Sequence, residues 1–270
     1  MLPSKNLREF WSGKRVLLTG HTGFKGSWTA TWLMQMGAEV HGFALAPETT
    51  PNLHDLLDLS YASETIADLR DHAAVKKMVD KVEPELVLHM AAQPLVRRAY
   101  REPVESMATN IMGTAHLLDA LRDCKNLAGV LVVTSDKAYD NDSYDQAKGE
   151  IIFREDDPLG GRDPYSASKG CQEIVARSFA QSYFRERHIP VVTARAGNVV
   201  GGGDWSEDRL MTDIIAAAIN DQAVELRNPA TTRPWQHVIE PVSGYLMYLQ
   251  AAVEGKTSLP ALNFGPNGSH

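Results

Sequence analysis

The sequence predicts an α/β fold in which a doubly wound parallel sheet is joined to a smaller C-terminal substrate-binding portion. Five short apolar or β-branched runs alternate with longer helical patterns, which is the order expected of βαβ units. A glycine-rich turn directly follows the first run, at the place where such sheets bind nucleotides. The predicted strands are residues 15–19, 39–44, 86–90, 130–134 and 191–194.

Three long helices are expected between these strands, and a fourth in a loop-rich excursion after the last of them. They are residues 26–36, 104–122, 164–187 and 211–220. Pro103 and Pro164 stand at helix starts, where a proline is favoured because its missing N–H needs no partner. We therefore assign residues 1–195 to a nucleotide-binding domain, to which residues 233–256 return. Residues 196–232 and 257–270 form the expected substrate-binding portion.

The charge and cysteine content exclude several classes of protein. The 270 residues include 34 acidic and 27 basic side chains, so no overall positive field favours binding to nucleic acid or to an anionic membrane. No apolar run reaches the roughly 18 to 20 residues of a membrane-spanning helix. The two cysteines, Cys124 and Cys171, lack metal-type spacing, so we expect no metal site, no disulfide and a reduced cytoplasmic location.

Gly20, Gly23 and Gly26 stand between the first predicted strand and the first predicted helix. Gly20 suits a tight turn, Gly23 lets backbone amides approach a pyrophosphate, and Gly26 permits close helix packing. The helix N-terminus adds unpaired N–H groups and a partial positive charge. Glycines alone can be ordinary turn residues, but this strand-turn-helix context is typical of a Rossmann-type dinucleotide site.

The second predicted strand lacks the acidic residue that usually binds the adenosine ribose of a dinucleotide. No Arg or Lys occurs in residues 42–51 to pair with the 2′-phosphate of NADP, so we expect NAD as the cofactor. Asp68 is a candidate for an adenine contact, with a helix N-cap as the equal alternative. Further cofactor contacts are expected from Thr22, Phe24, Leu69, Ala91, Ala92, Gln93 and Thr134.

Tyr165 and Lys169 are four positions apart and lie on one face of the predicted helix 164–187. An ammonium group beside a phenol favours the phenolate, which brings the tyrosine toward use as a base at neutral pH. Lys169 can also hold a cofactor ribose. The ordinary alternative is a surface tyrosine with an unrelated lysine, and the glycine turn counts against that alternative.

Ser135, Asp136 and Lys137 follow the predicted strand 130–134, at the edge where open α/β sheets bind ligands. Ser135 is placed to bond a substrate hydroxyl alongside Tyr165, while Asp136 and Lys137 offer an acid and a base. The alternative is a solvated ion pair in a loop. The expected catalytic residues are therefore Ser135, Asp136, Lys137, Tyr165 and Lys169.

These motifs resemble those of the extended short-chain dehydrogenase/reductase superfamily over nearly the whole chain, and within it those of the CDP-glucose 4,6-dehydratase family. The segments that carry the resemblance are residues 20–26, 89–97, 134–137, 156–161, 163–166, 195–205 and 233–238. Dehydratases of the dTDP-glucose type typically carry Thr-Asp-Glu where this chain has Ser135-Asp136-Lys137. The aspartate of that motif is therefore present as Asp136, whereas Lys137 stands in place of the glutamate. The identity of the catalytic base is left open.

The resemblance implies NAD-dependent dehydration of CDP-D-glucose to its 4-keto-6-deoxy derivative, a step of deoxysugar and O-antigen biosynthesis. Tyr165 takes the C4 hydroxyl proton while the C4 hydride passes to NAD, and Ser135 and Lys169 orient the phenol. Asp136 then donates a proton to the leaving C6 hydroxyl, and Lys137 removes the C5 proton or stabilises the enolate as a cation. The hydride returns to C6, which regenerates NAD.

Family position also assigns the nucleotide diphosphate to Asn198 and Arg233, with Arg209 as a further candidate. Other residues that can face the sugar are Arg97, Arg98, Tyr100 and His237. The resemblance implies a homodimer formed by the helices that begin near Pro103 and Pro164. Relative to the family the chain ends early, and a natural end and a truncated C-terminal portion both stay open as explanations.

Two kinds of alternative stay open from the residues. The nearest is another enzyme on the same scaffold, an NDP-sugar 4-epimerase or a different NDP-hexose 4,6-dehydratase. Asp136 beside Lys137 favours dehydration over epimerisation, because epimerisation does not need an acid to expel the C6 hydroxyl. The second is a non-catalytic regulator that binds a dinucleotide, and the presence of both Tyr165 and Lys169 argues against it.

Overall fold

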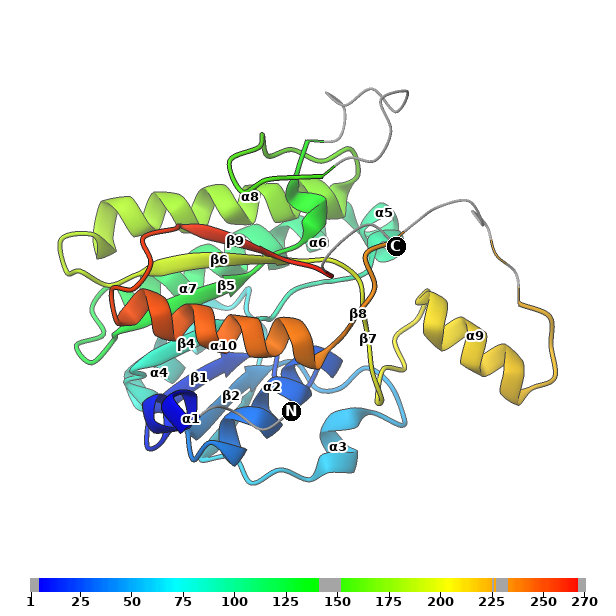
Figure 1. Cartoon of the computed structure of the whole chain (residues 1–270), viewed down its shortest axis with the longest axis horizontal. Helices are drawn as coiled ribbons and strands as arrows, with labels where there is room; N and C mark the ends of the chain where they lie inside the picture. The colour runs from blue at the N-terminus through cyan, green and yellow to red at the C-terminus, as the bar shows by residue number, and fades with distance from the viewer. Residues whose placement is uncertain (1–4, 141–151, 225, 227–232, 267–270) are drawn as a thin grey trace.

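The computed structural model describes residues 5–140, 152–224, 226 and 233–266, and its centre is a seven-stranded parallel sheet (Figure 1). The strand order is β3-β2-β1-β4-β5-β6-β9, which steps outward from β1 in both directions. This is the doubly wound topology that the sequence predicts, with its switch point between β1 and β4. The strands are β1 Arg15–Thr19, β2 Glu39–Ala44, β3 Ser63–Ile66, β4 Leu86–His89, β5 Gly129–Val133, β6 Val191–Ala196 and β9 Ala261–Phe264.

Helices cover both faces of this sheet and create two hydrophobic cores (Figure 1). One face is packed by α1 (Lys5–Trp11), α2 (Phe24–Gln35) and α10 (Ile239–Val253), and the other by α4 (His72–Val82), α7 (Gly113–Leu121) and α8 (Pro164–Phe179). Every residue of β4 and β5 is buried, which explains their continuous apolar sequence. None of the described helices is long and apolar enough to cross a membrane.

The remaining helices lie near the carboxyl ends of the strands or extend beyond them (Figure 1). They are α3 (Leu53–Leu57), α5 (Val96–Arg101), α6 (Pro103–Met107) and α9 (Leu210–Ile219). The predicted helix 104–122 is α6, a π-helical turn (Ala108–Met112) and α7 in one run, and α8 likewise continues into a π turn (Ala180–Phe184). The first of these turns presents a buried residue, Asn110, toward α8, where its Nδ2 donates to Ser168 Oγ at 2.8 Å.

Two strands depart from the sequence prediction. The edge strand β3 was not expected, because its alternating exposed and half-buried residues lack the apolar run that marks the central strands. The strand β9 pairs with β6 in the main sheet, so this part of residues 257–270 does not belong to the substrate-binding portion to which we assigned it. Pairing there covers the outer edge of β6, whose residues are all buried.

The excursion is held to the rest of the chain by a second, two-stranded parallel sheet. Its strands are β7 (Val199–Val200) and β8 (Gln236–His237), which leads directly into α10. The return of the chain after residue 233 is therefore made through this small sheet before α10 packs on the main one.

Candidate active site

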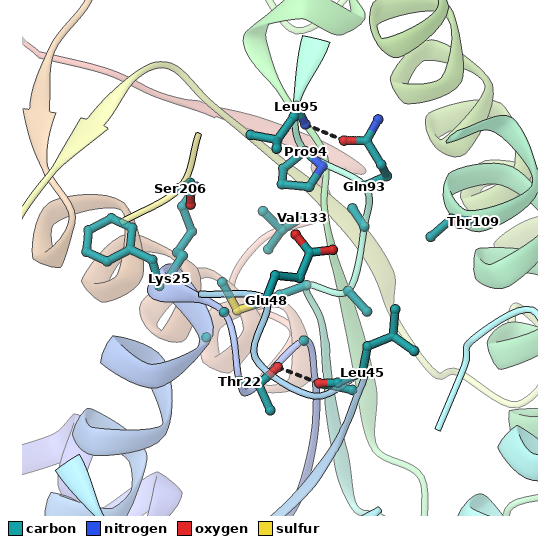
Figure 2. Close-up of a pocket in the computed structure, with 18 of the residues that line it drawn as sticks. Thr22, Lys25, Leu45, Glu48, Gln93, Pro94, Leu95, Thr109, Val133 and Ser206 are labelled. Carbon is teal, nitrogen blue, oxygen red and sulfur yellow. Dashed lines mark hydrogen bonds between the residues drawn. The ribbon is translucent and has the colours of Figure 1, made fainter. Parts of the chain in front are cut away.

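A cavity of about 570 Å³ opens at the carboxyl ends of β1, β4 and β5 (Figure 2). Nearly all of the sequence-predicted site residues line it. They are Gly20, Thr22, Gly23, Phe24, Gly26, Asp68, Leu69, Ala91, Ala92, Gln93, Thr134, Ser135, Asp136, Lys137, Tyr165, Lys169, Asn198 and Arg209. Arg233 is exposed and does not line the cavity, although its charge reaches Asp136.

The glycine turn has the close contacts that its sequence predicts. Gly20 has a φ of +77°, and a Cβ there would lie 2.7 Å from the backbone nitrogen of Ala91. A Cβ on Gly26 would lie 2.0 Å from the carbonyl oxygen of Gly20, so only a glycine lets α2 pack on the turn. Gly23 is exposed at the N-cap of α2 and leaves the helix N-terminus open to the cavity. This cradle fits a dinucleotide diphosphate, which binds to backbone N–H groups.

The end of β2 presents the backbone carbonyl of Leu45, which is bonded to the Thr22 hydroxyl of the glycine turn, where a carboxylate is usual. Thr22 Oγ1 donates to the carbonyl of Leu45 at 2.9 Å, which fixes the turn against the strand end (Figure 2). Asp68 is the nearby acid of the cavity, and its hydrogen bonds with Arg70 lower the pKa of its carboxyl. The helix cap is a different residue, Asp71, whose side chain accepts from Ala74 N. The N-cap alternative for Asp68 is therefore wrong.

A buried chain of polar side chains joins the glycine turn to Lys169. Thr19 Oγ1 bonds His89 Nδ1 at 2.7 Å, and His89 Nε2 bonds Thr114 Oγ1 at 2.9 Å. Gln172 donates to Thr114 at 2.8 Å and accepts from Lys169 Nζ at 2.9 Å. Burial lowers the pKa of His89 to about 3, so this imidazole is neutral. One of its ring nitrogens donates a hydrogen bond and the other accepts one. The chain sets the position of the Lys169 ammonium.

Tyr165 is buried and lines the cavity together with Ser135. Burial raises the pKa of Tyr165, while the Ser135 hydrogen bond and the charge of Arg209 act in the opposite direction. Burial and the charge of Lys25 lower the pKa of Lys169 to about 7. The groups that favour the phenolate here are thus Ser135 and Arg209. We had expected Lys169 to favour the phenolate. Its Nζ instead donates to Gln172 Oε1 and to the carbonyl oxygen of Val133, the latter at 3.4 Å.

Asp136 begins a short 3₁₀ turn (Asp136–Ala138) directly after β5. Ser135 Oγ donates to Asp136 Oδ1 at 3.0 Å and accepts from the backbone N–H of Lys137 at 3.2 Å, which holds the turn in shape. Burial raises the pKa of Asp136, against the lowering effect of Ser135, Lys137 and Arg233. A carboxyl group whose pKa is raised, in the same cavity as Tyr165, suits a proton donor, and it does not fit the solvated ion pair that was the alternative.

Lys25 is a cavity residue that the sequence analysis did not single out. It lies within the glycine turn, its Nζ is 3.4 Å from Tyr245 Oη, and it points into the pocket (Figure 2). Burial and the charge of Arg209 lower its pKa to about 8, while Asp136 raises it. The signal in the sequence that could have identified Lys25 is its charge, because it stands between Gly23 and Gly26, which serve backbone packing.

Thr134 and Gln93 line the cavity, but their polar side-chain groups are engaged by the protein. Thr134 Oγ1 donates to Glu173, which also forms a buried two-contact ion pair with Arg195 at 2.9 Å for each contact. Gln93 Oε1 accepts from Leu95 N at 2.5 Å, and this bond fixes the entry into α5 (Figure 2). Any cofactor contact of these residues would therefore come mainly from the backbone.

Arginines of α5 bind acidic residues of neighbouring loops at the rim of the cavity. Arg97 pairs with Asp208 at 2.6 Å, and Arg98 pairs with Glu48 at 2.7 Å. The first contact holds the excursion beside the cavity and the second joins α5 to the loop after β2, so Arg97 and Arg98 have protein partners in place of a sugar contact. Tyr100 is 65% exposed, and His237 packs edge-on against Trp28, with ring centroids 5.7 Å apart.

Comparison with known proteins gives consistent relatives for both sequence and fold. The profile of the GDP-mannose 4,6-dehydratase family matches residues 17–259. A CDP-glucose 4,6-dehydratase of Salmonella typhimurium is 47% identical over 96% of this chain and 73% of that protein. A dTDP-glucose 4,6-dehydratase of Neisseria gonorrhoeae is 26% identical over 90% of this chain and 71% of that protein.

Two solved structures share the fold. The epimerase Mth375 of Methanothermobacter thermautotrophicus superposes with a TM-score of 0.82 at 23% identity, covering 98% of this chain and 75% of that one. MoeE5 in complex with UDP-glucose and NAD gives a TM-score of 0.75 at 25% identity, covering 94% of this chain and 76% of that one. The predicted Rossmann-type fold is confirmed by both the topology and these superpositions.

Proposed function

This chain belongs to the nucleotide-sugar 4,6-dehydratases of the extended short-chain dehydrogenase/reductase superfamily, and we propose that its own substrate is CDP-D-glucose. The observation that carries the proposal of dehydration is the half-buried Asp136, which lines the same cavity as Tyr165 and has a raised pKa. The choice of the cytidine nucleotide is supported by the Salmonella relative. The product, a 4-keto-6-deoxy sugar nucleotide, would serve deoxysugar and O-antigen biosynthesis.

The proposed cofactor is NAD, held by the glycine turn and the end of β4. Its diphosphate would lie on the N-terminus of α2 at Gly23, and its adenosine end near Asp68 and Leu45. When bound, NAD supplies the redox chemistry by accepting a hydride from C4 of the sugar and later returning it to C6. The neutral surfaces of Ala91 and Ala92 let the cofactor lie close to the backbone.

In the oxidation step, the Tyr165 hydroxyl is the group proposed to remove the proton of the C4 hydroxyl. Ser135 is within hydrogen-bond reach of Tyr165 and orients it toward the same oxygen. Lys169, positioned through Gln172, would contact the cofactor ribose from below the tyrosine. The charge of Arg209 stabilises the phenolate that forms.

In the elimination step, Asp136 is proposed to protonate the leaving C6 hydroxyl. The rise in its pKa favours the protonated form, and its bond to Ser135 fixes its direction. Lys137 is the proposed base for the C5 proton, which the new 4-ketone makes acidic. Lys25 is a second candidate, because its pKa of about 8 gives it a neutral fraction near neutral pH.

The nucleotide diphosphate is proposed to bind Arg209, Asn198 and Arg233. Arg209 lines the cavity, and its buried Nε has no hydrogen-bond partner within the described part of the chain, so a donor is available for a phosphate oxygen. Asn198 lines the same wall. Arg233, which is exposed beside the cavity, would complete the site as substrate enters.

The experiment that tests this function is incubation of the protein with NAD and, in separate reactions, CDP-glucose, dTDP-glucose, GDP-mannose and UDP-glucose. Mass spectrometry should detect the loss of one water from CDP-glucose at a kcat/KM well above that for the other three. Faster water loss from another of these sugars would overturn the substrate assignment. Conversion to a 4-epimer without loss of mass would favour the epimerase alternative.

We also propose a cytoplasmic homodimer. Exposed apolar side chains on the run α6 to α7 and on α8, among them Val104, Met112 and Ile174, support association through these helices. The free thiols of Cys124 and Cys171 are consistent with a reducing compartment. Light scattering should give twice the chain mass, with Val104→Glu shifting it to the monomer. Fractionation of cells that produce the protein should recover it with cytoplasmic markers.

A further inference from the structure

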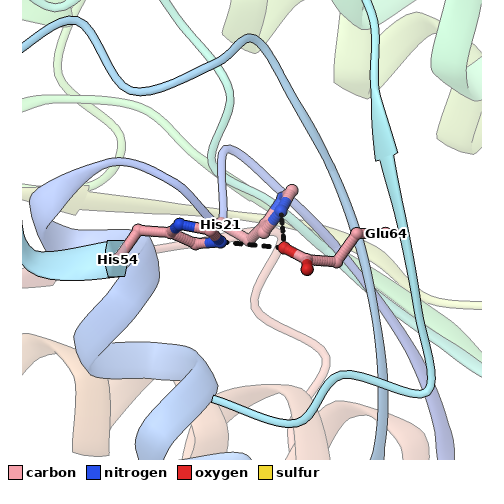
Figure 3. A group of neighbouring side chains, drawn as sticks. All are labelled: His21, His54 and Glu64. Carbon is pink, nitrogen blue, oxygen red and sulfur yellow. Dashed lines mark hydrogen bonds and ion pairs between the residues drawn. The ribbon is translucent and has the colours of Figure 1, made fainter. Parts of the chain in front are cut away.

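Two histidines and one glutamate meet beneath the cofactor-binding turn, outside the cavity (Figure 3). His21 directly follows Gly20, His54 comes from α3, and Glu64 comes from the edge strand β3. Their ligand atoms lie within 4.8 Å of one another. Three segments that are distant in the sequence therefore converge on one point.

Both imidazoles point at the same carboxylate oxygen. His21 Nε2 lies 2.9 Å from Glu64 Oε1, and His54 Nε2 lies 2.8 Å from it. Zinc binds imidazole nitrogen and carboxylate oxygen at about 2.0–2.2 Å, so three such atoms at this separation need only a small outward movement to surround one ion. Two histidines and one glutamate form a ligand set that zinc sites use, with water in the remaining position.

His54 Nδ1, the ring nitrogen that is not directed at Glu64, has a carboxylate partner, as the second ring nitrogen of a metal-binding histidine usually does. His54 Nδ1 lies 3.1 Å from Asp55 Oδ1. The other carboxylate oxygen of Asp55 accepts from Asn52 Nδ2 at 2.7 Å, so the acid is fixed in place. When Nδ1–H donates to Asp55, a neutral His54 turns its Nε2 lone pair toward the Glu64 oxygen, and a cation between these two acceptors satisfies both.

Packing limits the access of water to His21, while His54 is half-buried and Glu64 is exposed. His21 is fully buried, and the Tyr61 ring packs edge-on against it, with centroids 5.1 Å apart. The same ring stacks on His54 at 5.9 Å. On the other side, Gly42 leaves no room for a side chain, since a Cβ there would lie 2.6 Å from the His21 ring. The ligands are thus held by packing as well as by their hydrogen bonds.

We infer that His21, His54 and Glu64 form a site for a divalent transition-metal ion of the zinc class. The site joins the cofactor turn to β3 and to α3, whose Leu53 packs against Gly203 of the excursion. An ion bound there would stabilise the native arrangement of these segments, because it binds the folded chain in preference to the unfolded one. This inference stands independently of the proposed substrate.

The test is metal binding by the full chain after treatment with a chelator. Titration with ZnCl₂ by calorimetry should give one tight site per chain, and CoCl₂ should give the visible absorption of a low-symmetry site with nitrogen ligands. His54→Ala and Glu64→Gln should each weaken Zn²⁺ binding by more than tenfold. Circular dichroism and thermal melting should show that both variants remain folded.

His72→Ala is the matched control. His72 also lies beside a carboxylate, 3.1 Å from Asp119, and its ring centroid is 5.1 Å from that of His116, but these groups are at the surface. The control should bind Zn²⁺ as the parent chain does. Absence of stoichiometric Zn²⁺ binding to the parent chain, or equal affinity in the control and in the two cluster variants, would overturn the inference and leave a histidine–glutamate ion pair.

Discussion

Replacement of Asp136 by asparagine separates the proposed elimination step from the oxidation step. Asparagine has nearly the same shape, and its Oδ1 can still accept the bond that Ser135 donates at 3.0 Å. The substitution therefore keeps the turn after β5 and removes the carboxyl group whose pKa is raised and which is the proposed proton donor. What is lost is general acid catalysis at the C6 oxygen.

The expected magnitude follows from that single loss. A positioned general acid contributes about 10²- to 10⁴-fold to a rate, which corresponds to about 3–5 kcal/mol of activation free energy. Water loss should slow by this factor. Oxidation at C4 should change by less than about tenfold, because Tyr165 and Ser135 are unaltered. Loss of the Asp136 charge should also lower the pKa of Tyr165 and of Lys25, since Asp136 raises both.

The assay is a single-turnover reaction followed in two ways. Nicotinamide absorbance reports oxidation at C4, and quenched samples analysed by mass spectrometry report loss of water. Asp136→Asn should accumulate the reduced cofactor and the 4-keto sugar before water is lost. If both steps slow by the same factor, Asp136 does not act as the acid and the reasoning from its burial is wrong.

Four further predictions follow from the site and its supports. Gly26→Ala should weaken NAD binding more than tenfold by forcing a Cβ against Gly20, as measured by calorimetry, whereas Gly202→Ala, which has open space, should not. Glu173→Ala should lower the free energy of unfolding in urea by about 3–5 kcal/mol because it leaves Arg195 buried and unpaired; a loss as small as that of the surface variant Glu254→Gln would contradict this. If Lys25 is the base, deuterium exchange at C5 should rise as pH increases through about 8, since the lysine must be neutral to accept a proton, and Lys25→Met should abolish the rise; a profile unchanged in that variant leaves Lys137 as the base. Gln172→Leu should slow C4 oxidation in stopped-flow measurements and shift its pH profile, because Lys169 loses its acceptor, and an unchanged profile would show that the buried chain has no positioning role.

The central strands could be predicted from the sequence because burial on both faces demands uninterrupted apolar residues. The strands β1 and β2 match the predicted residues, and β4, β5 and β6 differ from them only at their ends. The edge strand β3 has no buried residue, so its sequence carries no such run. The role of β9 depends on its pairing with β6, which no local pattern encodes.

The position of the proposed catalytic residues in one cavity could be predicted because each follows a strand or lies on a helix at the carboxyl edge of the sheet, where topology brings them together. Ser135 and Tyr165 do meet there. The partner of Lys169 was not predictable, because the chain from Thr19 through His89 to Gln172 is assembled only by packing. The cluster of His21, His54 and Glu64 was missed for the same reason, and its three members lack any metal-type spacing.

The proposed reaction is an internal redox cycle that ends in dehydration. The measurement uses CDP-glucose with deuterium at C4, mixed with CDP-glucose that has no deuterium but carries ¹³C throughout the sugar. The account predicts a product lighter by one water, with deuterium at C6 only in molecules that lack ¹³C. Deuterium lost to solvent or found in ¹³C-labelled product would contradict transfer within one active site, and retention of the water would contradict dehydration itself.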